Sequence, residues 1–240
     1  MNRLLKLHFR RFEFKYLLTP DQYHHLKSLM VHRLQPDPFA NKQGFYISET
    51  RYLDTPQLTS YQQNKAGLKR RTKYRIRTYL NSTQNSPHVF WEIKRKYDMT
   101  VLKDRSPLTL KQSEKFLSTT QLISSTNQVI KKFIFAKNRY FLKPKVLIRY
   151  RREPFISLTP EFRITFDSQI QVAAIQHIQA QPTHFQSILP QLIIMEFKFT
   201  GSLPFWLGEI IKRHNLERQP FSKYVYGIEQ IKSHLPWVTS

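Results

Sequence analysis

The sequence predicts an α+β protein in which an antiparallel sheet forms a β-barrel, or a strongly curved surface, around a charged interior and carries helices outside. Three observations support this prediction. Five segments alternate charged and apolar side chains, the period-2 pattern of a strand with two unlike faces. Four of the five charged faces mix acids with bases, as expected where they share one polar space. Helix-like segments separate several of the strands. An ordinary antiparallel sheet with one solvated face would give the same alternation, so that alternative stays open.

The clearest alternating strand covers residues 89–96, where Glu92, Lys94 and Lys96 share a face with Phe90. Its other face is apolar and carries Trp91. The remaining charged faces are Arg11, Glu13 and Lys15; Lys73, Arg75 and Arg77; Arg163, Thr165 and Asp167; and Glu196 with Lys198.

Helix and turn signals place these strands in order along the chain. Thr19 and Pro20 have the residue types of a helix N-cap and first turn. No linker or internal repeat interrupts the chain, so a single domain over residues 1–240 is expected. The expected strands are 9–17, 44–52, 73–80, 90–96, 146–152, 162–170 and 192–200, and the expected helices are 20–34, a short one after Asp54, 108–140 with a break near Ser124, 204–215 and 222–234.

Composition excludes several classes of enzyme. The chain has 240 residues, 40% of them hydrophobic, which is enough for a substantial core. It has only 5 glycines and neither a P-loop nor a dinucleotide-binding fingerprint. It has no cysteine, and therefore no disulfide, thiolate nucleophile or cysteine-based zinc site.

The net charge of +23 indicates a polyanionic partner. Nucleic acid would suit the charge, but no RRM or KH signature is present, so nucleic acid is not the expected partner. No run of about 18 apolar residues predicts a transmembrane helix, and the N-terminus lacks the apolar core of a signal peptide. A cytoplasmic location is expected, with attachment to a membrane surface or a membrane protein through basic residues left open.

The strand pair formed by residues 73–77 and 92–94 carries the most informative chemistry. Basic residues two positions apart stand about 7 Å from each other on one face of a strand, a spacing suited to successive groups of a phosphate chain. Burying so many cations requires a bound anion or interleaved carboxylates. The sequence supplies such carboxylates, which can also bind Mg²⁺ or Mn²⁺: Glu13, Glu92, Asp167 and Glu196.

Eight motifs in one fixed order carry a family resemblance from about residue 9 to residue 232. The series is similar to the VTC-type polyphosphate polymerase domain, a branch of the CYTH-like triphosphate tunnel metalloenzymes. Each motif alone is weak, and their order makes the resemblance specific. The motifs are Arg11-Phe-Glu13-Phe-Lys15-Tyr16, Tyr52-Leu-Asp54-Thr55, Lys73-Tyr-Arg75-Ile-Arg77, Glu92-Ile-Lys94, Arg149-Tyr-Arg151-Arg152-Glu-Pro-Phe155, Arg163-Ile-Thr165-Phe-Asp167, Glu196-Phe-Lys198 and Ser222-Lys223-Tyr224.

This resemblance implies an eight-stranded antiparallel β-barrel, the triphosphate tunnel, flanked by helices. It further implies a metal-dependent polyphosphate polymerase that transfers the γ-phosphate of ATP to a polyphosphate chain, with Mn²⁺ or Mg²⁺ as cofactor. Glu196 would be the leading metal ligand, with Glu13 and Glu92 as second metal contacts or as partners that hold the lysines. The implied phosphate ligands are Lys15, Arg75, Arg77, Lys94, Arg149, Arg163, Lys198 and Lys223, of which Arg75, Arg77, Lys94 and Lys198 would hold the triphosphate.

One departure bears on the choice of reaction. The wider superfamily opens with E-x-E-x-K, whereas this chain has Arg11 at the first acidic position. That change favours the polymerase branch over a hydrolase with two metals. A triphosphate or tripolyphosphate hydrolase on the same fold, and a polyphosphate-binding module without turnover, remain the alternatives.

Overall fold

The computed structural model describes residues 11–81, 88–98, 100–118, 127–157 and 162–232. Its centre is one antiparallel sheet of ten strands, eight of which follow the order β1-β10-β8-β7-β3-β4-β5-β6, while β2 pairs with β7 and β9 with β8. The strands are β1 Arg11–Leu18, β2 Leu34–Pro36, β3 Tyr46–Asp54, β4 Arg70–Leu80, β5 His88–Tyr97, β6 Thr100–Thr109, β7 Lys143–Ser157, β8 Phe162–Ala174, β9 Gln186–Ser187 and β10 Ile193–Thr200.

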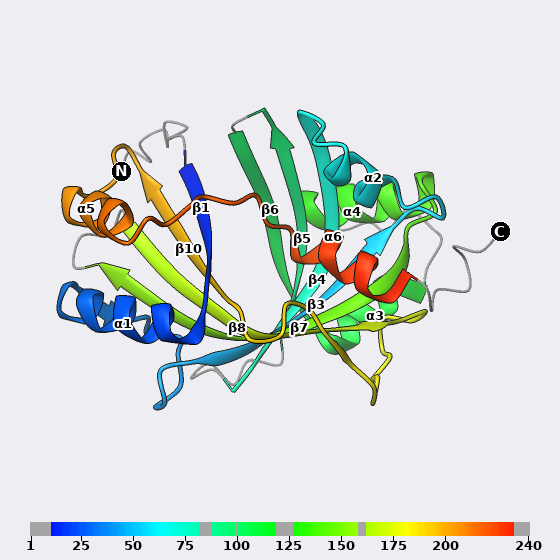
Figure 1. The fold of residues 1–240 in the computed structure, drawn as a ribbon. Coiled ribbons are helices and arrows are strands. Elements are labelled where there is room, and N and C mark those ends of the chain that lie inside the picture. Colours follow the sequence, from blue (N-terminus) through cyan, green and yellow to red (C-terminus); the bar gives the residue numbers. More distant parts are fainter. Residues whose placement is uncertain (1–10, 82–87, 99, 119–126, 158–161, 233–240) are drawn as a thin grey trace, which may run out of the picture.

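The eight-strand path curls around a concave face, as Figure 1 shows. Within the described ranges, no backbone ladder joins β1 to β6, so the sheet is a curled, open tunnel rather than a barrel closed by hydrogen bonds. Its two ends nevertheless approach each other. Lys94 Nζ of β5 lies 3.1 Å from Glu13 Oε2 of β1. An ion pair therefore bridges strands at opposite ends of the path.

Apolar side chains cover the convex face, opposite the charged positions. Helices α1 (Pro20–Met30) and α5 (Phe205–Arg213) pack on the phenylalanine-rich side of β1, β8 and β10. Helices α3 (Leu110–Ser118) and α4 (Gln128–Arg139) cover β4 and β5, where Trp91 is fully buried. The two strand faces predicted from alternation are thus confirmed: hydrocarbon lies outside and charge lies inside.

Helix α6 (Lys223–Ile231) is different because it packs on the concave side, against Ile148, Val172 and Tyr52 (Figure 1). Tyr224 stacks on Tyr52 with ring centroids 4.8 Å apart. Its hydroxyl donates to Asp54 Oδ2 at 2.6 Å. These contacts fix α6 across one end of the concave face, with its first residue, Lys223, directed into the charged interior.

Two shorter helices complete the described secondary structure. They are the 3-10 helix η1 (Val31–Arg33) and α2 (Thr59–Lys65). Asp54 accepts hydrogen bonds from the backbone amides of Ser60 and Tyr61, at 2.9 and 3.0 Å. The carboxylate therefore anchors the start of α2 as well as α6.

The sequence-based prediction missed three strands, namely the short strands β2 and β9 and the longer strand β6. Strand β6 (Thr100–Thr109) occupies the segment before the predicted long helix, and the helical region consequently begins at Leu110. Pro107 obscured this strand, but a proline is tolerated here because β6 lies at the edge of the sheet. The predicted break into two helices is confirmed by α3 and α4, although Ser124 lies outside the described residues. Residues 44–52 were predicted two positions early, since β3 is Tyr46–Asp54.

The close packing of α6 gives the first prediction. A Cβ atom added at Gly227 would lie 3.0 Å from Ile148 Cδ1 and 3.2 Å from Val172 Cγ2. We expect Gly227→Ala to lower the free energy of unfolding by roughly 1–3 kcal/mol, the usual cost of overpacking, in urea titrations. Gly208→Ala is the matched control, because nothing lies within 4 Å of its added Cβ. Equal stability of the two variants would contradict close docking of α6.

Candidate functional site

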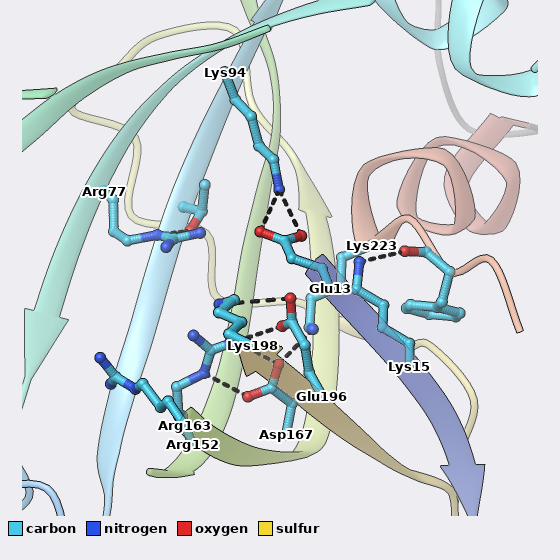
Figure 2. Close-up of polar contacts among 12 residues, drawn as sticks. Glu13, Lys15, Arg77, Lys94, Arg152, Arg163, Asp167, Glu196, Lys198 and Lys223 are labelled. Carbon is cyan, nitrogen blue, oxygen red and sulfur yellow. Dashed lines mark hydrogen bonds and ion pairs between the residues drawn. The ribbon is translucent and has the colours of Figure 1, made fainter. Parts of the chain in front are cut away.

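The concave face gathers more cations than carboxylates. Strand alternation directs these side chains inward from β1, β4, β5, β6, β7, β8 and β10, and α6 adds one more. Figure 2 shows most of them around one space. The cations are Lys15, Lys73, Arg75, Arg77, Lys94, Lys103, Arg105, Arg152, Arg163, Lys198 and Lys223, and the carboxylates are Glu13, Glu92, Asp167 and Glu196.

Glu92 is fully buried and forms ion pairs with three cations. Arg75 Nε lies 2.6 Å from its Oε2, while Arg105 Nε and Lys103 Nζ lie 3.4 and 3.7 Å from its Oε1. Burial acts to raise the pKa of Glu92, but Arg75 and Arg77 outweigh burial and hold this pKa far below its ordinary value. Glu92 is therefore ionised and acts as a counter-charge for the arginines of β4 and β6.

Asp167 forms the tightest ion pairs of the site. Arg152 donates two hydrogen bonds of 2.6 Å to its two carboxylate oxygens, and Lys223 Nζ lies 2.5 Å from Oδ2. Burial raises the pKa of Asp167, whereas Arg152 and Lys223 lower it to a net value of about 2. This carboxylate thus joins the sheet to the N-terminus of α6.

Glu196 is paired more loosely than Asp167 or Glu92. The nearest cationic atoms are Lys198 Nζ at 3.5 Å and Arg152 Nη2 at 3.7 Å. Burial acts to raise the pKa of Glu196, but Lys198 and its neighbours lower it well below the ordinary value. In the pairing of β1 with β10, Glu13 lies opposite Lys198 and Lys15 lies opposite Glu196, so the two carboxylates are diagonal neighbours on one face. Glu196 is consequently a buried anion whose ion pairs are longer than those of Asp167.

One end of the tunnel opens into a strongly basic cavity of about 780 Å³. Lys73 Nζ donates to Ser222 Oγ at 2.9 Å, and Lys15 Nζ donates to the backbone oxygen of Phe221 at 2.9 Å. Burial, together with Lys94 and Lys15, depresses the pKa of Lys73 well below its ordinary value. Such crowding of like charges favours an anion between them. The basic residues of the cavity lining are Lys15, Lys65, Arg71, Lys73, Lys94, Lys96 and Arg218.

The opposite end of β4 combines arginine with aromatic rings. Arg77 Nε donates to Thr50 Oγ1 at 3.0 Å. The Arg105 guanidinium lies 3.5 Å from the centroid of Phe90. Burial raises the pKa of Tyr79, but Arg77 and Arg105 bring it down to about 8. Positive potential therefore extends along the tunnel beyond the carboxylate cluster.

The structure brings together all but one of the predicted phosphate ligands. Arg149 lies on the convex face, where its Nη2 is 2.6 Å from Glu49 Oε1. The concave position on β7 belongs to Arg152. Arg163 remains on the concave face, with its Nη2 3.0 Å from Asp37 Oδ2. Lys103 and Arg105 were not predicted for the site, because strand β6, which carries them, was not predicted either.

The three predicted metal-ligand candidates do not form one cluster. Glu13 and Glu196 are diagonal neighbours across β1 and β10, whereas Glu92 is held by Arg75, Lys103 and Arg105. In the parts of the chain that the structure describes, no three histidine or acidic side chains converge as a metal site. Carboxylate oxygens nevertheless suit Mg²⁺ and Mn²⁺, ions that commonly complete their coordination with water and substrate phosphates. The pair Glu13–Glu196 fits such a shared site, and Glu92 does not.

The geometry defines a class of protein: a curled β-tunnel with a cationic interior, the triphosphate tunnel fold. The family model for the VTC domain matches residues 10–232. This chain belongs to the VTC domain family. Comparison with curated protein sequences gives no significant match. In the described part of the chain, no helix is long and apolar enough to cross a bilayer.

Solved structures resemble the fold at low sequence identity. A Bacillus halodurans protein, provisionally assigned as an adenylate cyclase, matches with a TM-score of 0.54 and 14% identity, covering 89% of this chain and 95% of that chain. A Pyrococcus horikoshii OT3 protein matches with a TM-score of 0.45 and 12% identity, covering 91% of this chain and 98% of that chain. The first likeness supports the shared fold, and the second is too distant to support an argument.

The crowded lysines give a prediction for stability. Burial lowers the pKa values of Lys73, Lys94 and Lys198 below 10.5 in the folded protein, with Lys73 most affected. Between those lowered values and 10.5 the unfolded chain binds more protons, so stability must rise with pH. We expect denaturant titrations to give a larger free energy of unfolding at about pH 9 than at about pH 7, with a smaller rise in Lys73→Met. A fall over this range would contradict the depressed lysine pKa values.

Proposed function

We propose that this protein is a metal-dependent polyphosphate polymerase that transfers the γ-phosphoryl group of ATP to the end of a polyphosphate chain. The observation that supports this proposal best is the excess of cations on the concave face, centred on the neighbouring carboxylates Glu13 and Glu196. A triphosphate supplies the missing negative charge along the tunnel. Membership of the VTC family supports the same substrate class.

Several side chains have donors oriented for a phosphate chain. Lys198 Nζ lies 3.5 Å from Glu196 Oε1, and Lys94 Nζ lies 3.1 Å from Glu13 Oε2, so each lysine is positioned by a carboxylate of the concave face. Arg152 is held by Asp167, which fixes the plane of its guanidinium. Fixed cations can stabilise developing phosphoryl charge without reorganising during the reaction.

The transfer needs positioning and charge neutralisation more than covalent help. An oxygen of the terminal phosphate of the acceptor chain, already ionised at neutral pH, attacks the γ-phosphorus. The bond from the γ-phosphorus to the β–γ bridging oxygen breaks, and ADP leaves while the chain gains one unit. Glu13 and Glu196 would hold Mn²⁺ or Mg²⁺, and the ion would neutralise phosphate oxygens when bound. Lys15, Arg75, Arg77, Arg163 and Lys223 would bind and orient the two phosphate chains.

An assay of products separates this activity from its two alternatives. Pure protein is incubated with ATP and Mn²⁺, and in parallel with ATP and Mg²⁺, and both long polyphosphate and free phosphate are measured. Polyphosphate together with ADP supports the polymerase. Free phosphate alone indicates a triphosphate hydrolase, in which water is the acceptor. Binding of triphosphate with neither product indicates a polyphosphate-binding module.

Glu196→Gln provides the sharpest test of the metal-binding role. The amide keeps the shape of the side chain but removes the charge that would hold the ion. We expect turnover to fall by at least ~100-fold, since a catalytic metal contributes several kcal/mol to stabilising transition-state charge. Glu209→Gln on the exposed surface of α5 is the matched control and should retain activity. Full activity of Glu196→Gln would remove Glu196 from the site.

A further inference from the structure

The convex face of β7 carries a second cavity, separate from the tunnel. Arg149 and Arg151 alternate with Tyr150 and Arg152 along the strand, so the first two face away from the tunnel interior. They line a cavity of about 590 Å³ beside the segment that follows β8. An adjoining cavity of about 390 Å³ also includes Arg151 and Ser168. We call the two cavities together the outer groove.

Positive charge exceeds negative charge in the outer groove. Glu49 pairs with Arg149 at 2.6 Å and with Arg51 at 3.5 Å. On the next part of β7, Glu153 pairs with Arg151 at 2.7 Å and with Lys27 at 2.5 Å. Each carboxylate thus forms ion pairs with two cations. Because a guanidinium has five N–H donors, both arginines keep donors for another anion after these pairs form.

Both groove arginines are held by aromatic rings. The guanidinium of Arg149 lies 4.3 Å from the centroid of Phe185, and that of Arg151 lies 4.3 Å from the centroid of Phe45. Stacking restrains the guanidinium plane while leaving its edge available for hydrogen bonds. The side chains remain 35% and 30% exposed, respectively, so a solute can reach them. The arginines are therefore preorganised and accessible.

The backbone around the outer groove is strained. Gln169, Leu189 and Gln191 line the groove and have φ values of 50°, 52° and 68°. The left-handed region is costly for residues other than glycine, and strain of this kind gathers at ligand sites. The lining also provides hydroxyl and amide groups from Ser168, Gln171, Ser187 and Gln191.

We propose that the outer groove binds a small anion of the diphosphate class, outside the tunnel. Arginines two residues apart on a strand stand about 7 Å from each other, which allows one guanidinium to serve each phosphoryl group. The planar guanidinium edge matches two phosphoryl oxygens. The hydroxyl and amide groups of the lining supply further donors for the remaining oxygens. This binding does not depend on the polymerase reaction in the tunnel.

The test uses inorganic diphosphate as the probe in calorimetric titrations without ATP or metal. We expect the double variant Arg149→Gln/Arg151→Gln to lose one equivalent of bound diphosphate relative to the unmodified protein. In this variant Glu49 still has its ion pair with Arg51, and Glu153 still has its ion pair with Lys27, so the variant should fold. Thermal unfolding checks this. The matched control, Arg139→Gln/Arg213→Gln, removes two exposed arginines from α4 and α5. It should bind as many equivalents of diphosphate as the unmodified protein.

A second variant separates binding from folding. Gln191→Gly removes an amide from the groove and relieves the strain of a non-glycine residue at φ 68°. The free energy of unfolding should therefore stay the same or rise, while the affinity of the outer groove for diphosphate falls several-fold. The proposal is overturned if the Arg149/Arg151 double variant keeps all equivalents, or if the control loses one as well. Equal binding of malonate in the groove would overturn the preference for phosphoryl groups. The outcome of these diphosphate titrations is independent of whether the ATP assay detects polyphosphate.

Discussion

The surplus of buried positive charge on the concave face is the constraint on which this structure depends. Like charges in a poorly solvated space repel strongly, and carboxylates must offset them. Here a single interior carboxylate forms ion pairs with more than one cation. Glu92 pairs with Arg75, Lys103 and Arg105, and Asp167 pairs with Arg152 and Lys223. These pairs hold the cations in place without neutralising them all. The interior therefore remains a site that a phosphate chain would complete.

This constraint also explains where the apolar surface goes. A sheet whose concave face is charged must bury hydrocarbon on its convex face, and α1, α3, α4 and α5 cover that face. Helix α6 is the exception, since it packs on an apolar end of the concave face and places Lys223 against Asp167. The same carboxylate thus helps to set both the position of α6 and the orientation of Arg152.

Alternation along the chain predicted the charged and apolar faces of β1, β4, β5, β8 and β10 because each has one polar and one apolar face. It could not assign Arg149 and Arg152, since β7 is buried on both sides and carries arginine on each. The resemblance placed Arg149 among the phosphate ligands, whereas the structure places Arg149 on the convex face and Arg152 on the concave face. Glu92 was predicted among the carboxylates that offset the buried cations, but not all of its partners were predicted. Two of its cations come from β6, an edge strand whose Pro107 masked the strand pattern.

The most direct test of the cationic tunnel is a crystal structure of the protein with inorganic triphosphate. The account predicts electron density for the triphosphate inside the curled sheet, within hydrogen-bond distance of Lys198 and Arg152, with α6 still packed at one end. Triphosphate bound only on the convex face, with the concave cations still paired solely with Glu13, Glu92, Asp167 and Glu196, would contradict it.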